Sequence, residues 1–204
     1  MKEHLQAFDK SNHTISIGSC APAPIWNLTP EVSRLFPDMK IQSDMKSLDE
    51  LVDGLINNKY QIIITTDEMN LPDIISRKYC EEHLYISLPP AHPLAGHKSL
   101  TLNDLNGQSI LILSKIGFWY DICKAKMPDS LFLVQEELSA LDELRKSSAL
   151  PSFATDLTNK SSSHDNRILI PLTDPEVNVT FYINYNKSYK KQFESIIYTS
   201  IDSK

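Results

Sequence analysis

The side chains that could bind a small molecule lie where predicted strands end. Ser19, Cys20 and Ala21 join an alternating strand, residues 14–18, to a helix that begins near Pro22. Ligands bind at this edge of open α/β sheets, and the unpaired backbone N–H groups at a helix start favour an anion or a carboxylate. Ser19 is the first candidate for such a contact, although an ordinary N-cap residue would look the same.

Further polar candidates follow later predicted strands. Thr65 and Thr66 end an apolar strand at residues 60–65, and their hydroxyl groups can donate or accept hydrogen bonds. A plain strand-end turn explains these threonines equally well. Residues 114–118 (SKIGF) stand between a predicted strand and a helix, and Lys115 supplies a positive charge that could meet an acid, although a loop lysine is usually only solvated.

Catalytic and metal-binding patterns are missing from the sequence. His92 and His97 are separated by a Pro and Gly turn and lack the i, i+4 spacing of a helical zinc site. No Gly-x-Ser-x-Gly elbow, P-loop or dinucleotide-binding glycine motif occurs. Phe118 and Trp119 could enclose a ligand, but aromatic residues in the first turn of a helix more often fill a core. We therefore predict a binding protein without metal or cofactor, and not an enzyme.

Charge and hydropathy narrow the range of partners. The 204 residues carry a net charge of −6, which argues against direct binding of nucleic acid by this chain. The apolar runs are far shorter than the roughly 20 residues of a membrane helix, and the polar start MKEHLQAFDK lacks the apolar part of a signal peptide. Three distant cysteines are typical of thiols in a reducing cytosol. We expect a cytoplasmic protein that does not contact a membrane.

Strand and helix patterns alternate along the chain, which predicts an α/β fold with right-handed crossovers. A helix is expected at residues 22–36, kinked or restarted at Thr29 because Pro30 interrupts it. Ser47 and Glu50 form the capping box of the next helix, and Ser188 is expected to cap the last one. The other expected elements are strands at 14–18, 39–43, 60–65, 84–88, 109–113, 131–135, 167–172 and 179–185, a helical turn at 101–107, helices at 118–127 and 138–145, and a polar turn at 160–166.

The most specific pattern is LYISLPPAHPLAG at residues 84–96, an alternating strand that ends in Pro-Pro and a His-Pro-Leu-Ala-Gly turn. With five other segments in the same order it resembles the effector-binding domain of LysR-type transcriptional regulators, over residues 15–201. The chain departs from the family pattern at Gln61, where the family usually has Asp, and at 146–149, where it usually has Gly-x-Gly. The five other segments are ISIGS at 15–19, LFPDMKI at 35–41, LVDGLINNKYQIII at 51–64, LPSFATDL at 150–157 and ILIPLTDPEVNVTFYINY at 168–185.

The resemblance implies two Rossmann-like lobes of the periplasmic-binding-protein type II architecture, joined by two crossover strands at about 84–88 and 179–184. Lobe I would comprise residues 11–86 and 179–204, lobe II residues 87–178, and residues 1–10 would be the remnant of a linker helix. A small acidic or polar effector would lie in the cleft between the lobes. The ligand-binding residues implied by family position are Ser19, Cys20, Ala21, Thr65, Thr66, Ser114, Lys115, Ile116, Gly117, Phe118, Phe153 and Thr155.

The family also implies the partners. The domain would form a homodimer, and a tetramer in the full-length protein, and DNA would be bound only through a winged helix-turn-helix that this sequence lacks. We expect the sequence to be part of a longer regulator. Two alternatives stay open: an extracytoplasmic solute-binding protein of the same fold, which would need an export signal, and a lyase on a related two-lobed fold, such as a prephenate-dehydratase-like enzyme, whose Thr-Arg-Phe motif is absent.

Overall fold

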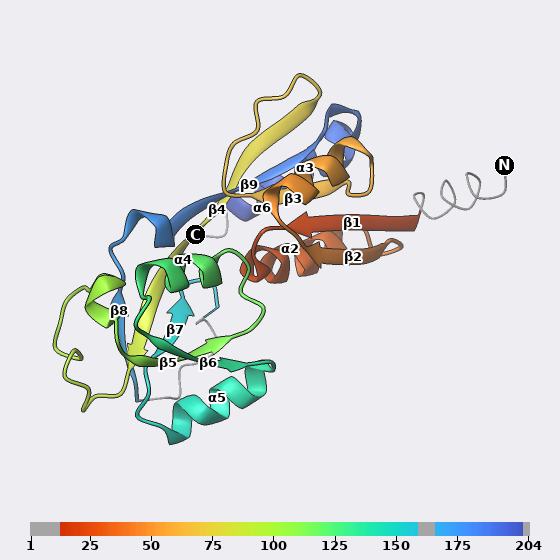
Figure 1. Cartoon of the computed structure of the whole chain (residues 1–204). Helices are drawn as coiled ribbons and strands as arrows, with labels where there is room; N and C mark the ends of the chain where they lie inside the picture. The colour runs from red at the N-terminus through yellow and green to blue at the C-terminus, as the bar shows by residue number, and fades with distance from the viewer. Residues whose placement is uncertain (1–12, 159–165, 202–204) are drawn as a thin grey trace. The chain divides into compact units, whose positions relative to one another are not determined.

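The computed structural model describes residues 13–158 and 166–201 (Figure 1). The chain forms two compact units: unit 1 contains the described residues up to Cys80 and those from Thr180 onwards, and unit 2 runs from Glu81 to Val179. Helices and strands alternate, which confirms the predicted α/β class. The expected linker-helix remnant at 1–10 and nearly all of the polar turn at 160–166 lie outside the described residues.

Unit 1 is a mixed sheet with helices packed on it. Its strands follow the order β2-β1-β3-β9, in which β1 is parallel to both β2 and β3, and β3 is antiparallel to β9. Helix α2 packs on β1 and β2, α3 packs on β1 and β3, and α6 contacts α2. The elements are β1 (Thr14–Ser19), α2 (Pro22–Leu35), β2 (Lys40–Met45), α3 (Leu48–Ile56), β3 (Ile62–Thr65), β9 (Asn178–Asn186), the 3-10 turn η4 (Lys187–Tyr189) and α6 (Lys190–Ile201).

Unit 2 has its own sheet, with strand order β4-β7-β5-β6 and β8 paired to β4. Strand β5 is parallel to β6 and β7, whereas β4 is antiparallel to β7 and β8. Helix α5 packs on β5 and β6. The elements are β4 (Ile74–Leu88), the 3-10 turn η1 (Asn103–Leu105), β5 (Ser109–Leu113), α4 (Trp119–Lys126), β6 (Leu131–Gln135), α5 (Leu138–Ser147), β7 (Ser152–Thr155), β8 (Ile168–Pro171) and the 3-10 turn η3 (Pro175–Val177).

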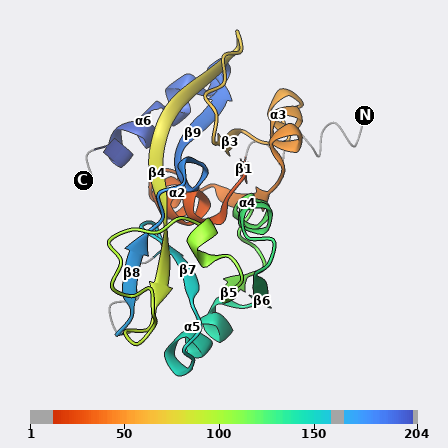
Figure 2. The ribbon, with the colours of Figure 1, turned by 60° about the vertical axis from the view of Figure 1, so that its left-hand side comes forward.

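Strands β4 and β9 are the two connections between the units (Figure 2), and they are neighbours in the strand order. The chain leaves unit 1 within β4, between Cys80 and Glu81, and returns within β9, between Val179 and Thr180. The prediction placed the first crossing strand at residues 84–88 only, whereas β4 begins at Ile74. In its first half the buried residues Ile75 and Ser76 are adjacent and the exposed Arg77 and Lys78 follow, so the sequence offers little hydrophobic alternation there.

Local signals account for most helix boundaries, with two corrections. The Glu50 carboxylate accepts hydrogen bonds from the backbone N–H and the hydroxyl of Ser47, as the capping box predicts. Helix α2 is not restarted at Thr29: it continues through Pro30, and the Thr29 hydroxyl donates to the Ile25 carbonyl one turn back. Ser188 does not cap the last helix, because it lies inside η4, whose cap is Asn186.

Each unit buries its own apolar core. In unit 1, Leu51, Leu55, Tyr60 and Ile63 form a cluster between α3 and β3. The cluster is tight, since a Cβ atom added at Gly54 would lie 2.5 Å from the Tyr60 ring. In unit 2, the core cluster joins β4, α4, β8 and the turns η1 and η3; it includes Leu84, Ile86, Leu88, Leu105, Ile110, Trp119, Cys123, Met127, Ile170 and Val177.

Candidate ligand-binding site

In unit 1, two of the predicted segments lie at one edge of the sheet. Ser19 ends β1 and Thr65 ends β3, and the parallel register pairs Ser19 with Ile64. The backbone N–H of Cys20 donates to the Ile64 carbonyl at 3.1 Å, which holds the two strand ends together. The structure therefore places Ser19, Cys20, Thr65 and Thr66 along the edge where open α/β sheets bind ligands.

The Ser19 hydroxyl is engaged with its own loop. It donates to the Ala21 carbonyl at 2.7 Å and accepts from the Ala21 N–H at 3.2 Å, and the whole residue is buried. The N-cap position of α2 is Ala21 and not Ser19. Pro22 and Pro24 have no N–H group, so the first turn of α2 offers fewer donors to an anion than most helix starts.

The Thr65 hydroxyl is hydrogen-bonded to Asn184, a buried residue that was not among the predicted ligand contacts. It donates to the Asp67 carbonyl at 2.8 Å and accepts from the Asn184 side-chain amide at 2.8 Å. The same amide nitrogen donates to the Tyr182 carbonyl, so the other atom, Asn184 Oδ1, must be the oxygen. This oxygen is buried and accepts no hydrogen bond from the described residues. Thr66 is half-buried, and its hydroxyl contacts the Asp67 carboxylate at 3.4 Å.

In unit 2, the segment 114–118 forms the loop between β5 and α4. The Ser114 N–H donates to the Gln135 carbonyl at 2.8 Å, and its hydroxyl donates to Glu136 at 3.0 Å. Gly117 has a φ of +66°, a left-handed conformation that favours glycine and turns the chain into α4. Lys115 is exposed, Ile116 and Phe118 pack against the core, and the ring of Phe118 lies 4.5 Å from that of Trp119 between centroids.

The remaining predicted ligand residues, Phe153 and Thr155, lie at the end of β7, near the start of α4. Phe153 is half-buried against the core. Thr155 is buried, and its hydroxyl lies 2.9 Å from that of Thr158, which holds the turn after the strand. Thr155 and Trp119 also share a neighbour, the carboxyl of Glu82.

Glu82, on β4, is a buried acid that the prediction did not include. It is 1 % exposed, and its Oε2 atom makes no hydrogen bond with the described residues. Burial raises its pKa to about 7 and the charge of Asp156 adds to this, against the lowering effects of the Thr155 hydroxyl, the Trp119 indole and His83. The alternation of β4 contains the signal, because Glu82 occupies the same strand phase as the buried residues Leu84, Ile86 and Leu88.

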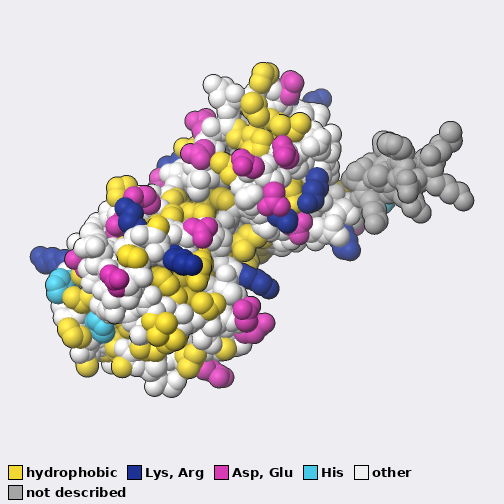
Figure 3. Space-filling model, in the orientation of Figure 1, with side chains coloured by type: hydrophobic (Ala, Val, Ile, Leu, Met, Phe, Trp, Pro, Cys, Tyr) yellow, Lys and Arg dark blue, Asp and Glu magenta, His cyan; other side chains and the backbone are white. Residues whose placement is uncertain are grey.

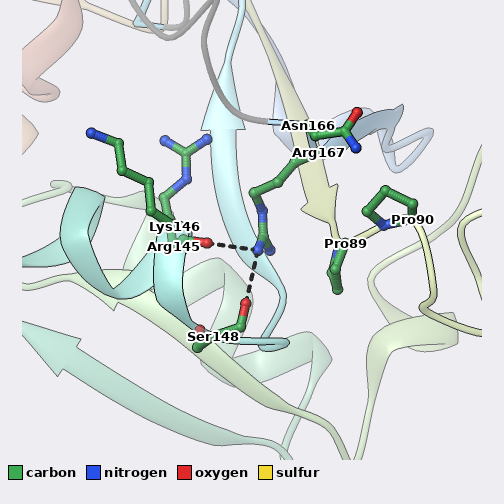
Figure 4. A pocket seen from close by; sticks show the side chains of 7 residues that line it. All are labelled: Pro89, Pro90, Arg145, Lys146, Ser148, Asn166 and Arg167. Carbon is green, nitrogen blue, oxygen red and sulfur yellow. Dashed lines mark hydrogen bonds between the residues drawn. The ribbon is translucent and has the colours of Figure 1, made fainter.

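A separate pocket of about 310 Å³ lies in unit 2 (Figure 4), and none of the predicted ligand residues line it. Arg167 occupies its centre and donates to five acceptors: the hydroxyl and carbonyl of Ser87 and the carbonyls of Leu150, Arg145 and Ser148. This guanidinium ties the end of α5 to β4 and is already engaged with protein groups, which makes it a structural clamp. The pocket is lined by Pro89, Pro90, Arg145, Lys146, Ser148, Asn166 and Arg167.

Metal clusters and membrane-spanning helices are both missing from the described part of the chain. Residues 13–158 and 166–201 contain no group of three or more His, Cys, Asp or Glu side chains that could hold a metal ion. Within the same ranges, every helix is too short or too polar to cross a membrane.

Sequence and structure comparisons place the chain among known regulators. Residues 12–192 match the family model of the LysR substrate binding domain. No curated protein sequence matches the chain. The reduced form of the OxyR regulatory domain from Pseudomonas aeruginosa superimposes with a TM-score of 0.67 at 19 % identity, covering 93 % of this chain and 97 % of that one.

Two further solved structures have the same fold. The BenM effector binding domain with its effector benzoate gives a TM-score of 0.62 at 18 % identity, with 93 % of this chain and 90 % of that one covered. A full-length OxyR variant from Pseudomonas aeruginosa gives 0.66 at 19 % identity and 94 % coverage of this chain. The chain spans only 65 % of that full-length protein. These matches confirm the predicted periplasmic-binding-protein type II fold.

Proposed function

The chain belongs to the LysR substrate-binding domain family, the effector-sensing domain of LysR-type transcriptional regulators, and on this basis we propose that it binds a small acidic or polar metabolite through strand-end residues of its two units. The contacts would come from Ser19–Ala21 and Thr65–Thr66 of unit 1, and from residues 114–118, Phe153 and Thr155 of unit 2. The family match over residues 12–192 carries this proposal. The domain would regulate and not catalyse.

The geometry ranks the proposed contacts. Lys115 is exposed at the start of the loop before α4, so its ammonium group is available to an acidic effector. The hydroxyls of Ser19 and Thr65 already bond to nearby backbone carbonyls, so they would serve a ligand mainly as acceptors or after rearrangement. Asn184 Oδ1 adds an acceptor next to Thr65, which suits an effector that also carries a hydroxyl or amine donor.

Two further partners, DNA and a second copy of the chain, are proposed from the family. In the whole regulator we place DNA binding in a winged helix-turn-helix outside this sequence, and we place the regulator in the cytoplasm, where its DNA lies. Acidic and basic side chains are mixed over the face in view in Figure 3, which does not resemble the clustered basic surface that phosphate binding needs. We further propose a homodimer, to which the exposed apolar side chains Leu131, Val134 and Leu138 of β6 and α5 contribute.

The effector proposal is tested by identifying a ligand and then removing Lys115. Native mass spectrometry of the purified protein, followed by thermal-shift screening of carboxylate metabolites, supplies the ligand, because a bound ligand raises the melting temperature by mass action. In Lys115→Met, a lost charge-assisted hydrogen bond should weaken binding by about 1.5–3 kcal/mol, or roughly ten- to a hundredfold, in isothermal titration calorimetry.

Lys124→Met is the matched control, because Lys124 is exposed on α4 and its loss removes the same net charge. Equal affinities of both variants and the unmodified chain would exclude Lys115 from the site. Failure of every acidic or polar compound to shift the melting temperature would contradict the proposed effector class.

A further inference from the structure

Glu82 lies at the point where β4 enters unit 2, one residue after the boundary at Glu81. Two elements of unit 2 bring polar groups to its carboxyl group. The Trp119 indole comes from the start of α4, and the Thr155 hydroxyl comes from the end of β7. The apolar core residue Leu84 follows two positions along the same strand face. The carboxyl is therefore buried beside an indole and a hydroxyl, on the strand face that carries the apolar core.

The charges around Glu82 do not balance an ionised carboxylate. The titratable groups that act on it are Asp156, which follows β7, and the adjacent His83. His83 is committed to Asp156: its Nδ1 lies 2.7 Å from one carboxylate oxygen, and its backbone N–H donates to the other at 3.0 Å. Neither Lys nor Arg is among the groups that shift its pKa most. An ionised Glu82 would thus be a buried charge beside a second acid, which is costly unless the group is neutral or rehydrated.

We propose that Glu82 is a proton switch of unit 2: as the neutral acid it packs against Trp119 and Thr155, and as the carboxylate it draws in water and loosens the start of α4. The Oε2 atom, which has no partner among the described residues, is where the carboxylate would meet that water. Because α4 follows directly on the loop 114–118, its loosening would also free that loop. The proton would then be an input to the domain in addition to its effector.

The direction of the effect follows from the pKa, which burial raises from the ordinary 4.5 to about 7. A carboxyl whose pKa is higher in the folded state binds its proton more tightly when folded, so its contribution to stability is complete below pH 4.5 and is lost as the pH rises through about 7. Between these limits, the difference of about 2.5 pKa units means that this one group should raise the unfolding equilibrium constant by about two to three orders of magnitude.

Tryptophan fluorescence tests the switch directly. The chain has two tryptophans: Trp119 is 4 % exposed, and Trp26, at 48 % exposed, can be removed by Trp26→Phe. In this background, titration from pH 5 to pH 9 should shift the Trp119 emission to longer wavelength with a midpoint near 7. Glu82→Gln keeps the shape of the neutral acid, so it should hold the short-wavelength emission at every pH.

Two controls separate Glu82 from other titrating groups. His83→Asn replaces the imidazole by an amide that can still donate to Asp156, and the midpoint should survive this change. Glu143→Gln removes an exposed carboxyl of α5 and should change nothing. A transition that persists in Glu82→Gln, or disappears in His83→Asn, overturns the proposal.

A second measurement does not depend on any variant folding. The carboxyl ¹³C resonance of Glu82 in the unmodified chain should titrate with a midpoint above pH 6. A midpoint below pH 5 would show an ordinary carboxylate and would also overturn the proposal. Neither experiment uses an effector, so its outcome is separate from that of the effector test.

Discussion

Among single residues, Arg167 is the clearest case of a charged side chain used for structure. It is half-buried, and its three nitrogens donate to carbonyls and a hydroxyl from β4, from the end of α5 and from Leu150 before β7. The last carbonyls of a helix lack partners within the helix, and Arg167 supplies donors to that region of α5. Only a planar group with several fixed donors can reach all these acceptors at once.

Arg167→Met should therefore lower the free energy of unfolding by about 2–4 kcal/mol, because it leaves several partly buried carbonyls without donors. Urea denaturation followed by circular dichroism measures this loss. The matched control is Arg77→Met. Arg77 is exposed, and within the described residues its guanidinium donates a hydrogen bond to the carbonyl of the adjacent Ser76. A loss of less than about 0.5 kcal/mol in both variants would show that the Arg167 clamp contributes little.

Gly54 shows how a missing side chain sets the packing of Tyr60. The Gly54 carbonyl accepts hydrogen bonds from Lys59 at 2.7 Å and from Tyr60 at 3.1 Å, so the chain turns tightly over the helix end. The buried Tyr60 ring lies where a Cβ atom of residue 54 would be, and its ring carbons would be 2.5 and 2.6 Å away.

Gly54→Ala should lower the free energy of unfolding by about 1–3 kcal/mol, because the overpacking exceeds the roughly 1 kcal/mol that alanine adds to a helix. The melting temperature, measured by calorimetry, should fall. Gly96→Ala is the control, because no atom lies within 4 Å of a Cβ placed there. An unchanged or raised melting temperature in Gly54→Ala would mean that the Tyr60 ring moves freely.

At the scale of elements, periodicity predicted most of the fold. Strands β5 and β6 begin and end where their apolar runs do, and α3 begins at its capping box. The first ten residues of β4 were not predicted, because they lack an apolar face in the sequence and gain their strand geometry from pairing with distant segments. Pro30 was expected to kink α2 or make it restart at Thr29, yet one helix continues through Pro30, with Leu28 and Val32 buried on either side of it.

Part of the candidate site could be predicted because apolar periodicity also marks where strands end. Strand ends are visible in the sequence, so Ser19, Thr65 and the loop 114–118 could be proposed as contacts from the sequence. Glu82 and Asn184 lie inside strands, and a polar residue inside a strand is normally placed on the exposed face. The burial of Asn184 depends on which face β9 presents, and this is set by partners far away in the sequence. Glu82 could have been found, because it shares the strand phase of the buried residues Leu84, Ile86 and Leu88.

At the scale of the whole molecule, the proposed homodimer makes a prediction about β6. This strand ends the strand order of unit 2 and exposes Leu131 (59 %) and Val134 (41 %), and α5, which packs on β6, exposes Leu138 (51 %). Large apolar side chains exposed at an open sheet edge are typical of a protein interface. Leu131→Asp should shift the chain from dimer to monomer in sedimentation equilibrium.

Leu71→Asp, at a 39 % exposed leucine of unit 1, should leave the dimer intact. Monomer behaviour of the unmodified chain at all concentrations would contradict the proposed homodimer. A dimer that survives Leu131→Asp would place the interface elsewhere.

The order in which the two units take their segments from the chain has a consequence for synthesis. Unit 2 is one continuous stretch, Glu81 to Val179, whereas unit 1 needs β9 and α6 from the C-terminal end, which bring the buried aromatics Phe181, Tyr185 and Phe193. On the ribosome, unit 2 can therefore complete its core before the N-terminal strands of unit 1 have their C-terminal partners, β9 and α6. The N-terminal unit would be the last to close, and a nascent chain stalled before Thr180 would present its unfinished sheet to chaperones.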